Sequence, residues 1–256
     1  MPSLVQHIAT LYPDSSNRTI RNWIKWGRVR VDGKRPEGHT ITEGQKVEIL
    51  KQKSYVLYSD KWVIAVEKPA GMLSVPDATG ARSMLDRLRD QYTSVFPVHR
   101  LDRDASGVLL FARSLPAKKR LGEMFRNHEL DREYIAVVEG RVAQKSGTLT
   151  QPLLELESYD VVVSDEGRPS TTHFETLRVA RLTSVLRVKL ETGRKHQIRV
   201  HLSNMGHPIL GDHRYGAQLN SNKRIALHAR SLAFINPMSG KKLLIESSNH
   251  QFTENL

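Results

Sequence analysis

The stretch VHRLDRDASGVLLFARS, residues 98–114, constrains the fold most strongly. Its run from Val108 to Phe111 is entirely apolar and is bounded by Gly107 and the charged Arg113. A short apolar run of this kind predicts a buried strand rather than a helix. The polar cluster HRLDRD that precedes it is therefore predicted to be a loop fixed at one end to the core. Because a rigid strand positions the side chains of such a loop, we expect catalytic or binding residues there.

A bound calcium ion is one alternative interpretation of this loop. Asp102, Asp104, Ser106 and Gly107 stand at the first, third, fifth and sixth positions of a calcium-loop pattern. The twelfth position is Arg113, where the pattern needs a bidentate glutamate, and apolar strand formers lie between. The calcium interpretation is therefore disfavoured.

A transition metal and a purely structural turn are two further alternatives. His99 and Asp102 are possible metal ligands by residue type, but two arginines flank them and would repel a cation. A structural turn of paired arginines and aspartates explains the composition equally well. Composition alone favours this structural turn.

The charge balance indicates a polyanionic partner. The 256 residues include 39 Lys and Arg against 27 Asp and Glu, a net charge of +12. A generally basic protein without such a partner is the alternative. The absence of cysteine excludes a disulfide scaffold and thiolate metal sites, and fits a reducing compartment. Without an apolar run of roughly 18 residues or a signal-peptide pattern at the N-terminus, we expect no membrane association and a cytoplasmic protein.

The first 50 residues predict two short helices and a hairpin. Residues 3–12 carry an apolar stripe at helical spacing, with Ser3 as the predicted N-cap and Pro13 as the stop. Residues 17–26 repeat the pattern and end before a glycine. The segment VRVDGK alternates and turns at Asp-Gly, which predicts a hairpin whose returning strand contains Val47 and Ile49. Residues 51–60 are polar and are interpreted as a linker, with a strand beginning near residue 56.

The rest of the chain alternates between segments with the apolar spacing of a strand and segments with the apolar spacing of a helix. Antiparallel pairing is favoured by the alternation and the β-branched content of its strands. Strands are predicted at 62–68, 132–140, 160–163, 172–180, 184–191, 225–235 and 241–248, and helices at 83–92, 115–128 and 195–205. Ser83 and Asp86 form a predicted capping pair.

Three motifs in one order carry a family resemblance. HRLDRDASG with its strand, EKPAGMLS upstream and TGRKHQIRVHLSNMGHPILGDHRYG downstream closely resemble the RluA-type pseudouridine synthases of ribosomal and transfer RNA, over roughly residues 55–250. The resemblance implies an α+β fold, with a mixed, largely antiparallel central sheet flanked by helices in a catalytic domain at 53–256. One departure is Ala105, where the family usually has Thr; this removes a local side-chain hydrogen bond.

The resemblance also implies a site. Asp102 matches the catalytic aspartate, Tyr134 the tyrosine that stacks on the target base, and Arg199 the arginine that pairs with the aspartate. The helical spacing independently puts Arg199 at the border of a buried face, where its charge needs an acidic partner. Lys68 and Pro69 match the motif that shapes the floor of the site.

The implied reaction detaches a uracil from nitrogen 1, rotates it and reattaches it through carbon 5, with no cofactor and no metal. Whether Asp102 attacks the nucleotide or removes a sugar proton stays open. Arg100 matches a position that helps to occupy the space left by the flipped nucleotide. An ion pair with Asp104 is its structural alternative.

Residues 1–52 look like the alpha-L motif of a small-subunit ribosomal protein. In that family a basic helix and strand grip RNA phosphates, and many RluA-type enzymes carry the module at this place. The predicted RNA-binding residues of this module are Arg18, Arg21, Lys25, Arg28 and Arg30. A solvated helix face is the alternative interpretation of the same charges.

The sequence thus predicts an isomerase, an RNA pseudouridine synthase acting on structured RNA. Ribosomal RNA of the large subunit is favoured, transfer RNA is the second substrate class, and the chain is expected to be a monomer. Two alternatives are an inactive RNA-binding or ribosome-assembly factor on the same scaffold, and a hydrolytic nucleosidase or nuclease.

Overall fold

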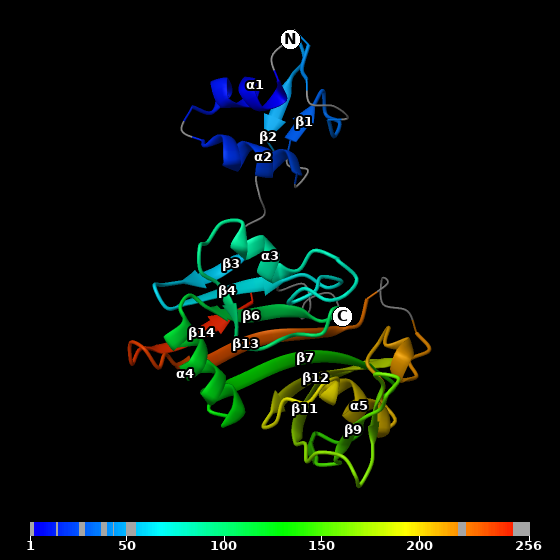
Figure 1. The fold of residues 1–256 in the computed structure, drawn as a ribbon. Coiled ribbons are helices and arrows are strands. Elements are labelled where there is room, and N and C mark those ends of the chain that lie inside the picture. Colours follow the sequence, from blue (N-terminus) through cyan, green and yellow to red (C-terminus); the bar gives the residue numbers. More distant parts are fainter. Residues whose placement is uncertain are drawn as a thin grey trace. The chain divides into compact units, whose positions relative to one another are not determined.

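The protein consists of two compact units, Met1–Ser54 and Tyr55–Leu256, each with its own apolar core (Figure 1). The computed structural model describes residues 3–13, 15–25, 29–36, 40–42, 44–49, 55–219 and 224–247. The predicted boundary after residue 52 falls between the described ranges.

Two helices and a two-stranded antiparallel sheet form the first unit: α1 (Leu4–Leu11), α2 (Asn17–Lys25), β1 (Val29–Val31) and β2 (Val47–Ile49). Ser3 caps α1 through a reciprocal capping box with Gln6, which confirms the predicted cap. The turn after β1 lies at Asp32 and Gly33, both with positive φ (50° and 76°), as an Asp-Gly turn requires. Local sequence signals therefore set the start of α1 and the turn after β1 in this unit.

A large sheet organises the second unit. Within the described residues it has ten strands, and its main path runs in the order β3-β4-β6-β13-β7-β12-β11-β8, with β14 paired to β13 and β5 to β6. The strands are β3 (Val56–Ser59), β4 (Val63–Lys68), β5 (Phe96–Pro97), β6 (Ser106–Ala112), β7 (Asp131–Glu139), β8 (Ser146–Leu149), β11 (Thr172–Val179), β12 (Thr183–Leu190), β13 (Leu227–Ile235) and β14 (Lys242–Glu246). A separate hairpin pairs β9 (Leu153–Glu155) with β10 (Val161–Val163).

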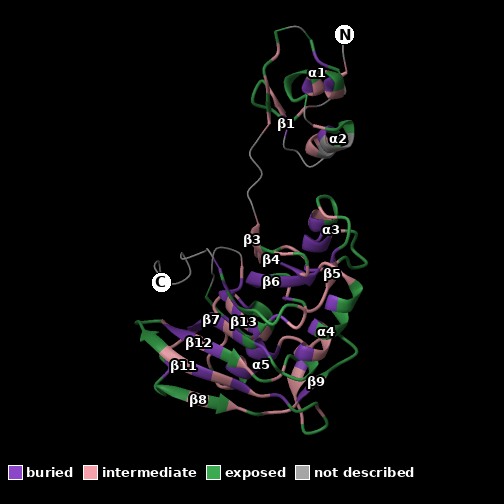
Figure 2. Ribbon diagram, turned by 90° about the vertical axis from the view of Figure 1, so that its left-hand side faces the viewer, coloured by how far each residue is buried: buried purple, intermediate pink, exposed green. Residues whose placement is uncertain are grey.

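Helices cover both faces of the sheet around β4 and β6. Helix α4 (Leu115–Arg126) packs on the face that includes Val108 and Leu110, and α3 (Met84–Arg89) and α5 (Gln197–Asn204) pack on the face that includes Leu109 and Phe111. This explains why β6 is apolar without alternation and is buried along its whole length, whereas the outer strand β8 is exposed (Figure 2).

Strand β6 runs parallel to β13, and Gly107 makes their close approach possible. Gly107 lies opposite Ala229 and has φ of 112°, and a Cβ atom there would clash with the Ala229 carbonyl oxygen. On the other side of β13, Tyr134 of β7 is also paired with Ala229. This register brings Tyr134 near the start of β6, where the loop carrying Asp102 ends.

The predicted α+β class and the largely antiparallel sheet are confirmed. The strand predicted from Val108 to Phe111 is β6, and Ser83 with Asp86 caps α3 as predicted. The short strands β5, β8 and β9 and the 3-10 helix η1 (His213–Tyr215) were not predicted individually. In the described part of the chain, no helix combines the length and apolar character needed to cross a membrane.

Candidate active site

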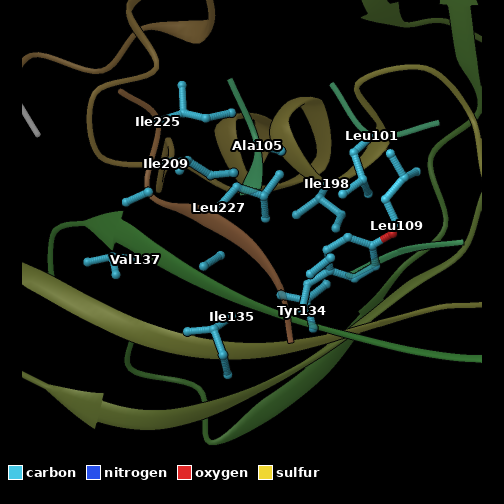
Figure 3. Packing of buried hydrophobic residues seen from close by; sticks show 14 of the residues in the cluster. Leu101, Ala105, Leu109, Tyr134, Ile135, Val137, Ile198, Ile209, Ile225 and Leu227 are labelled. Carbon is cyan, nitrogen blue, oxygen red and sulfur yellow. The ribbon is translucent and has the colours of Figure 1, made fainter. Parts of the chain in front are cut away.

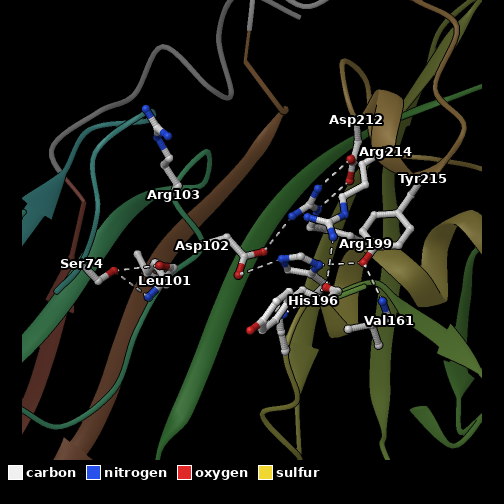
Figure 4. Close-up of polar contacts among 12 residues, drawn as sticks. Ser74, Leu101, Asp102, Arg103, Val161, His196, Arg199, Asp212, Arg214 and Tyr215 are labelled. Carbon is white, nitrogen blue, oxygen red and sulfur yellow. Dashed lines mark hydrogen bonds and ion pairs between the residues drawn. The ribbon is translucent and has the colours of Figure 1, made fainter. Parts of the chain in front are cut away.

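Asp102 lies in the loop between β5 and β6, with 26% of its side chain exposed. The turn after β4 holds this loop on both sides of the aspartate. The Ser74 hydroxyl donates to the Leu101 carbonyl (2.7 Å) and accepts from the Leu101 amide (3.0 Å; Figure 4). Lys68 Nζ donates to the carbonyl oxygen of Arg103 (3.0 Å). The backbone at Asp102 is therefore fixed before any substrate binds.

Lys68 is the buried cation beneath this loop. Its ammonium also donates to the carbonyl oxygens of Pro69 (3.1 Å) and Met72 (2.8 Å). Burial lowers the pKa of Lys68 to about 8, although the charges of Asp102 and Asp104 oppose the shift. At neutral pH most of the Lys68 side chains therefore keep the proton and all three donor hydrogens. The Lys68 ammonium thus joins the turn after β4 to the loop that carries Asp102, which gives the EKPAGMLS motif a physical role.

Helix α5 brings Arg199 to the aspartate. The Arg199 Nη1 atom lies 3.3 Å from Oδ2 of Asp102, and only 6% of the Arg199 side chain is exposed. The remaining edge of the guanidinium faces Asp212, with Nε to Oδ2 at 2.7 Å and Nη2 to Oδ1 at 2.8 Å. The ring of Tyr215 lies 4.9 Å from the guanidinium carbon. Arg199 is thus held in one orientation, with its third nitrogen toward Asp102.

The main partner of Arg199 differs from the one expected. The predicted partner Asp102 makes the longer contact, and Asp212 makes the bidentate one. Burial alone would lower the pKa of Arg199, but the hydrogen bonds and charges of Asp212 and Asp102 outweigh it and raise the pKa. Asp212 lies in the motif GDHRYG, which contributed to the family resemblance. The sequence did not distinguish its role from that of any other acidic residue.

His196 and Tyr215 complete the surroundings of Asp102. The Nε2 atom of His196 lies 4.0 Å from Oδ1 of Asp102, and Nδ1 lies 2.7 Å from the Tyr215 hydroxyl (Figure 4). That hydroxyl accepts from the amide of Val161 (3.3 Å), so its own hydrogen is available to Nδ1. Burial lowers the pKa of His196 to about 4, although the charge of Asp102 opposes the shift. The neutral ring therefore favours its proton on Nε2, toward the carboxylate.

The backbone of His196 is left-handed, with φ of 54°. Such a conformation is uncommon for a residue other than glycine and recurs at functional sites. Neither His196 nor Tyr215 was predicted from the sequence to be a site residue. Both lie within the downstream motif, but their pairing depends on how α5 and η1 pack.

Tyr134 lies within the core close to the aspartate. It packs among Leu101, Leu109 and Ile198 (Figure 3). Burial raises the pKa of its hydroxyl, and the charges of Arg132 and Asp102 act on it in opposite directions. The structure thus brings together Asp102, Tyr134 and Arg199 from β7, α5 and the loop before β6.

The metal interpretations of the Asp102 loop find no support in this arrangement. Ser106 and Gly107 are buried in β6, and Asp102 contacts a guanidinium. The Nε2 atom of His99 accepts from the amide of Leu110 (2.9 Å), so this side chain anchors the loop to the strand. No cluster of three or more potential metal ligands occurs in the part of the chain that the structure describes.

The predicted RNA-binding residues are placed only in part. Arg100 is exposed and makes no ion pair with Asp104 within the described residues. Arg21 is exposed on α2, and Arg30 of β1 is half-buried, with Nη1 donating to the Val29 carbonyl (3.1 Å). Arg28 and the side chains of Arg18 and Lys25 lie outside the described residues.

Comparisons with known proteins match this chain to one family. The model of the RNA pseudouridylate synthase family matches residues 62–204. The ribosomal large subunit pseudouridine synthase D of Xanthomonas campestris pv. campestris is 34% identical over 275 residues, covering 92% of this chain and 82% of that protein. The protein of the same name from Yersinia pestis is 32% identical, covering 93% and 84%.

A solved structure agrees at the level of the fold. Human RNA pseudouridylate synthase domain containing 1 aligns with a TM-score of 0.64 at 22% identity, covering 76% of this chain and 83% of that one. The family match includes Asp102, Tyr134 and Arg199, and it confirms the resemblance inferred from the three motifs. This chain therefore belongs to the RNA pseudouridylate synthase family and is an isomerase of uridine in RNA.

Proposed function

We propose that this enzyme converts uridines of large-subunit ribosomal RNA to pseudouridine in the cytoplasm, with Asp102 as the catalytic carboxylate. The observation that carries the proposal is the contact of Asp102 with Arg199, which is itself oriented by Asp212. The substrate class is supported by the two relatives, which are named ribosomal large subunit pseudouridine synthase D. The match with this chain covers more than four-fifths of the length of each.

The two oxygens of Asp102 have different surroundings. Oδ2 contacts Arg199, whereas no described hydrogen-bond donor lies within bonding distance of Oδ1. The guanidinium of Arg199 occupies Oδ2, and Oδ1 keeps its lone pairs for the substrate. Attack on the nucleotide and removal of a sugar proton both need a carboxylate oxygen with free lone pairs, which is Oδ1. Release of the uracil from its sugar therefore begins at Oδ1 in either mode.

Tyr134 and the exposed arginines hold the detached base and the RNA around it. Tyr134 lies near enough to Asp102 for that charge to act on its hydroxyl. In this proposal its ring stacks on the uracil while the base rotates, and its hydroxyl stays protonated because burial raises its pKa. The target uridine must leave its helical stack to reach the carboxylate, at a cost of a few kcal/mol. Exposed arginines such as Arg100 favour the RNA backbone nearby and offset part of this cost.

The substrate is tested by mapping. Ribosomal RNA and transfer RNA transcripts from the source organism are incubated with the purified chain, and pseudouridines are located by chemical mapping and reverse transcription. We expect conversion of one or a few uridines in large-subunit RNA, without cleavage or free base. Conversion restricted to transfer RNA would contradict the proposed substrate, and free uracil would indicate a hydrolase.

The first unit is proposed to bind RNA phosphates. Deleting residues 1–50 should weaken RNA binding by roughly ten-fold or more at low salt and reduce its salt dependence, because phosphate contacts release counterions. Part of the activity should remain, since Asp102, Tyr134 and Arg199 all belong to the second unit. Binding constants at two salt concentrations give the measurement.

A full-length control separates charge from truncation. Replacing Arg21 and Arg30 together by serine removes two cations while keeping the unit, and should change binding in the same direction. An unchanged binding constant and salt slope after the deletion would contradict a role for this unit in RNA binding.

A further inference from the structure

The turn between β9 and β10 presents an aromatic ring to solvent. Tyr159 is 70% exposed, the largest fraction among the large hydrophobic side chains of the described residues. Its backbone is left-handed, with φ of 63°, a conformation that is sterically unfavourable for tyrosine and is readily adopted by glycine. Local stability therefore does not account for a tyrosine at this position, and a strained residue of this kind suggests function.

Two cations, Lys195 and Arg214, hold the turn. Lys195 Nζ and Arg214 Nη2 both donate to the Tyr159 carbonyl oxygen, each at 3.0 Å. Lys195 also pairs with Glu155 (2.5 Å), and Arg214 pairs with Asp160 (2.6 Å). The ammonium of Lys195 lies 5.1 Å from the centre of the Tyr159 ring. The ring is thus presented by a turn that is pinned by both cations.

The residues that pin the turn are neighbours of the residues around Asp102. Lys195 precedes His196 and Arg214 precedes Tyr215 in the chain, and these two neighbours contact each other beside the aspartate. The amide of Val161 in β10 also donates to the Tyr215 hydroxyl (3.3 Å; Figure 4). The hairpin is therefore joined to the candidate active site through several direct bonds.

The charge of Arg100 also acts on this hairpin. The hydrogen bond from Lys195 is the main cause that lowers the pKa of Glu155, and the charge of Arg100 contributes to the same shift. Arg100 belongs to the loop that carries Asp102. The turn that presents Tyr159 is joined to the candidate active site through Lys195 and Arg214, whose chain neighbours His196 and Tyr215 contact each other there.

We propose that Tyr159 is a stacking platform for an unpaired base next to the reactive uridine. This inference rests on the proposed function, because a flipped uridine in structured RNA leaves neighbouring bases without their usual stack. The nearby cations Lys195 and Arg214 are already paired with Glu155 and Asp160. Glu157 adds a further carboxylate to the same hairpin, so the ring is better suited to the face of a base than to a backbone phosphate. Base stacking on an aromatic ring tolerates any sequence, so the platform supplies affinity and position.

Substitutions of Tyr159 test the platform in the full-length enzyme. With the ribosomal RNA transcript used to test turnover, Tyr159→Ala and Tyr159→Gly should each raise the Kd about ten-fold, whereas Tyr159→Phe and Tyr159→Trp should stay within about three-fold of wild type. The glycine variant relieves the left-handed strain, so it should be at least as stable to heat as wild type while losing the same affinity.

A second RNA locates the stacked base. Abasic nucleotides are placed one or two positions from the reactive uridine on either side. At one of these positions the abasic nucleotide should lower the affinity of the wild-type enzyme about ten-fold. At that position it should not lower the affinity of Tyr159→Ala further, because this variant already lacks the stacking contact. Leu244→Ala is the matched control, because Leu244 is 65% exposed on β14 and should change nothing.

The outcomes separate the two proposals. Equal Kd values for wild type and Tyr159→Ala would overturn the platform, as would additive losses at every abasic position. Failure of the wild-type enzyme to form pseudouridine in ribosomal RNA would instead overturn the proposed function, and it is measured on the same transcript. A loss of affinity in Tyr159→Phe equal to that of the alanine variant would assign the effect to the hydroxyl and not to stacking.

Discussion

The Asp102→Asn variant should bind ribosomal RNA as tightly as the wild-type enzyme and form almost no pseudouridine. Asparagine keeps the size of the side chain and an oxygen for Arg199, but it carries no charge and neither attacks nor removes a proton. We expect a fall in the rate of at least about a thousand-fold. Release of tritium from RNA labelled at carbon 5 of uridine gives the rate, and filter binding gives the affinity.

Asp104 provides the matched control for this experiment. It lies in the same loop and is exposed, and it makes no described ion pair with Arg199. Asp104→Asn should therefore retain activity within about three-fold. Turnover by Asp102→Asn close to that of wild type would contradict the assignment of the catalytic carboxylate. A wild-type enzyme that binds RNA and never modifies it would instead favour the inactive scaffold.

The Asp212→Asn variant should lose both stability and activity. Only 1% of the Asp212 side chain is exposed, and it neutralises the buried Arg199 through two hydrogen bonds. Removing one partner of a buried ion pair destabilises a protein by roughly 3–5 kcal/mol. For a chain of this size this corresponds to a fall in Tm of about 6–20 °C. Differential scanning calorimetry measures it.

The loss of activity has a separate geometric cause. Without the charge of Asp212, the guanidinium of Arg199 is expected to turn toward Asp102 and to bind both carboxylate oxygens. A misplacement of about 1 Å at the reacting atoms can reduce the rate about a hundred-fold. Glu175→Gln is the control, because it removes an exposed ion pair with Arg187 and should cost less than about 1 kcal/mol. An Asp212→Asn enzyme with wild-type Tm would contradict this account of Arg199.

Local patterns were sufficient for most elements of the fold. The apolar run at Val108, the capping pair Ser83 with Asp86 and the Asp-Gly turn at residue 32 all depend on neighbours within four residues. Backbone geometry sets these periods and caps directly, so the sequence predicted them correctly. The order of the three motifs likewise indicated the family, and with it the α+β sheet.

Tertiary structure decided the partners of the charged residues. Asp102 and Arg199 are 97 residues apart, and their contact depends on the parallel pairing of β6 with β13 and on the packing of α5 over the sheet. Nothing local distinguishes Asp212 from other acidic residues, and only the fold makes it the principal partner of Arg199. Through the family resemblance of its motifs, the sequence therefore proposed Asp102, Tyr134 and Arg199 as site residues. It did not select His196, Asp212 or Tyr215, whose places depend on how α5 and η1 pack. Only the packed structure determined which atoms meet, because contacts across the sheet depend on the register of several strands at once.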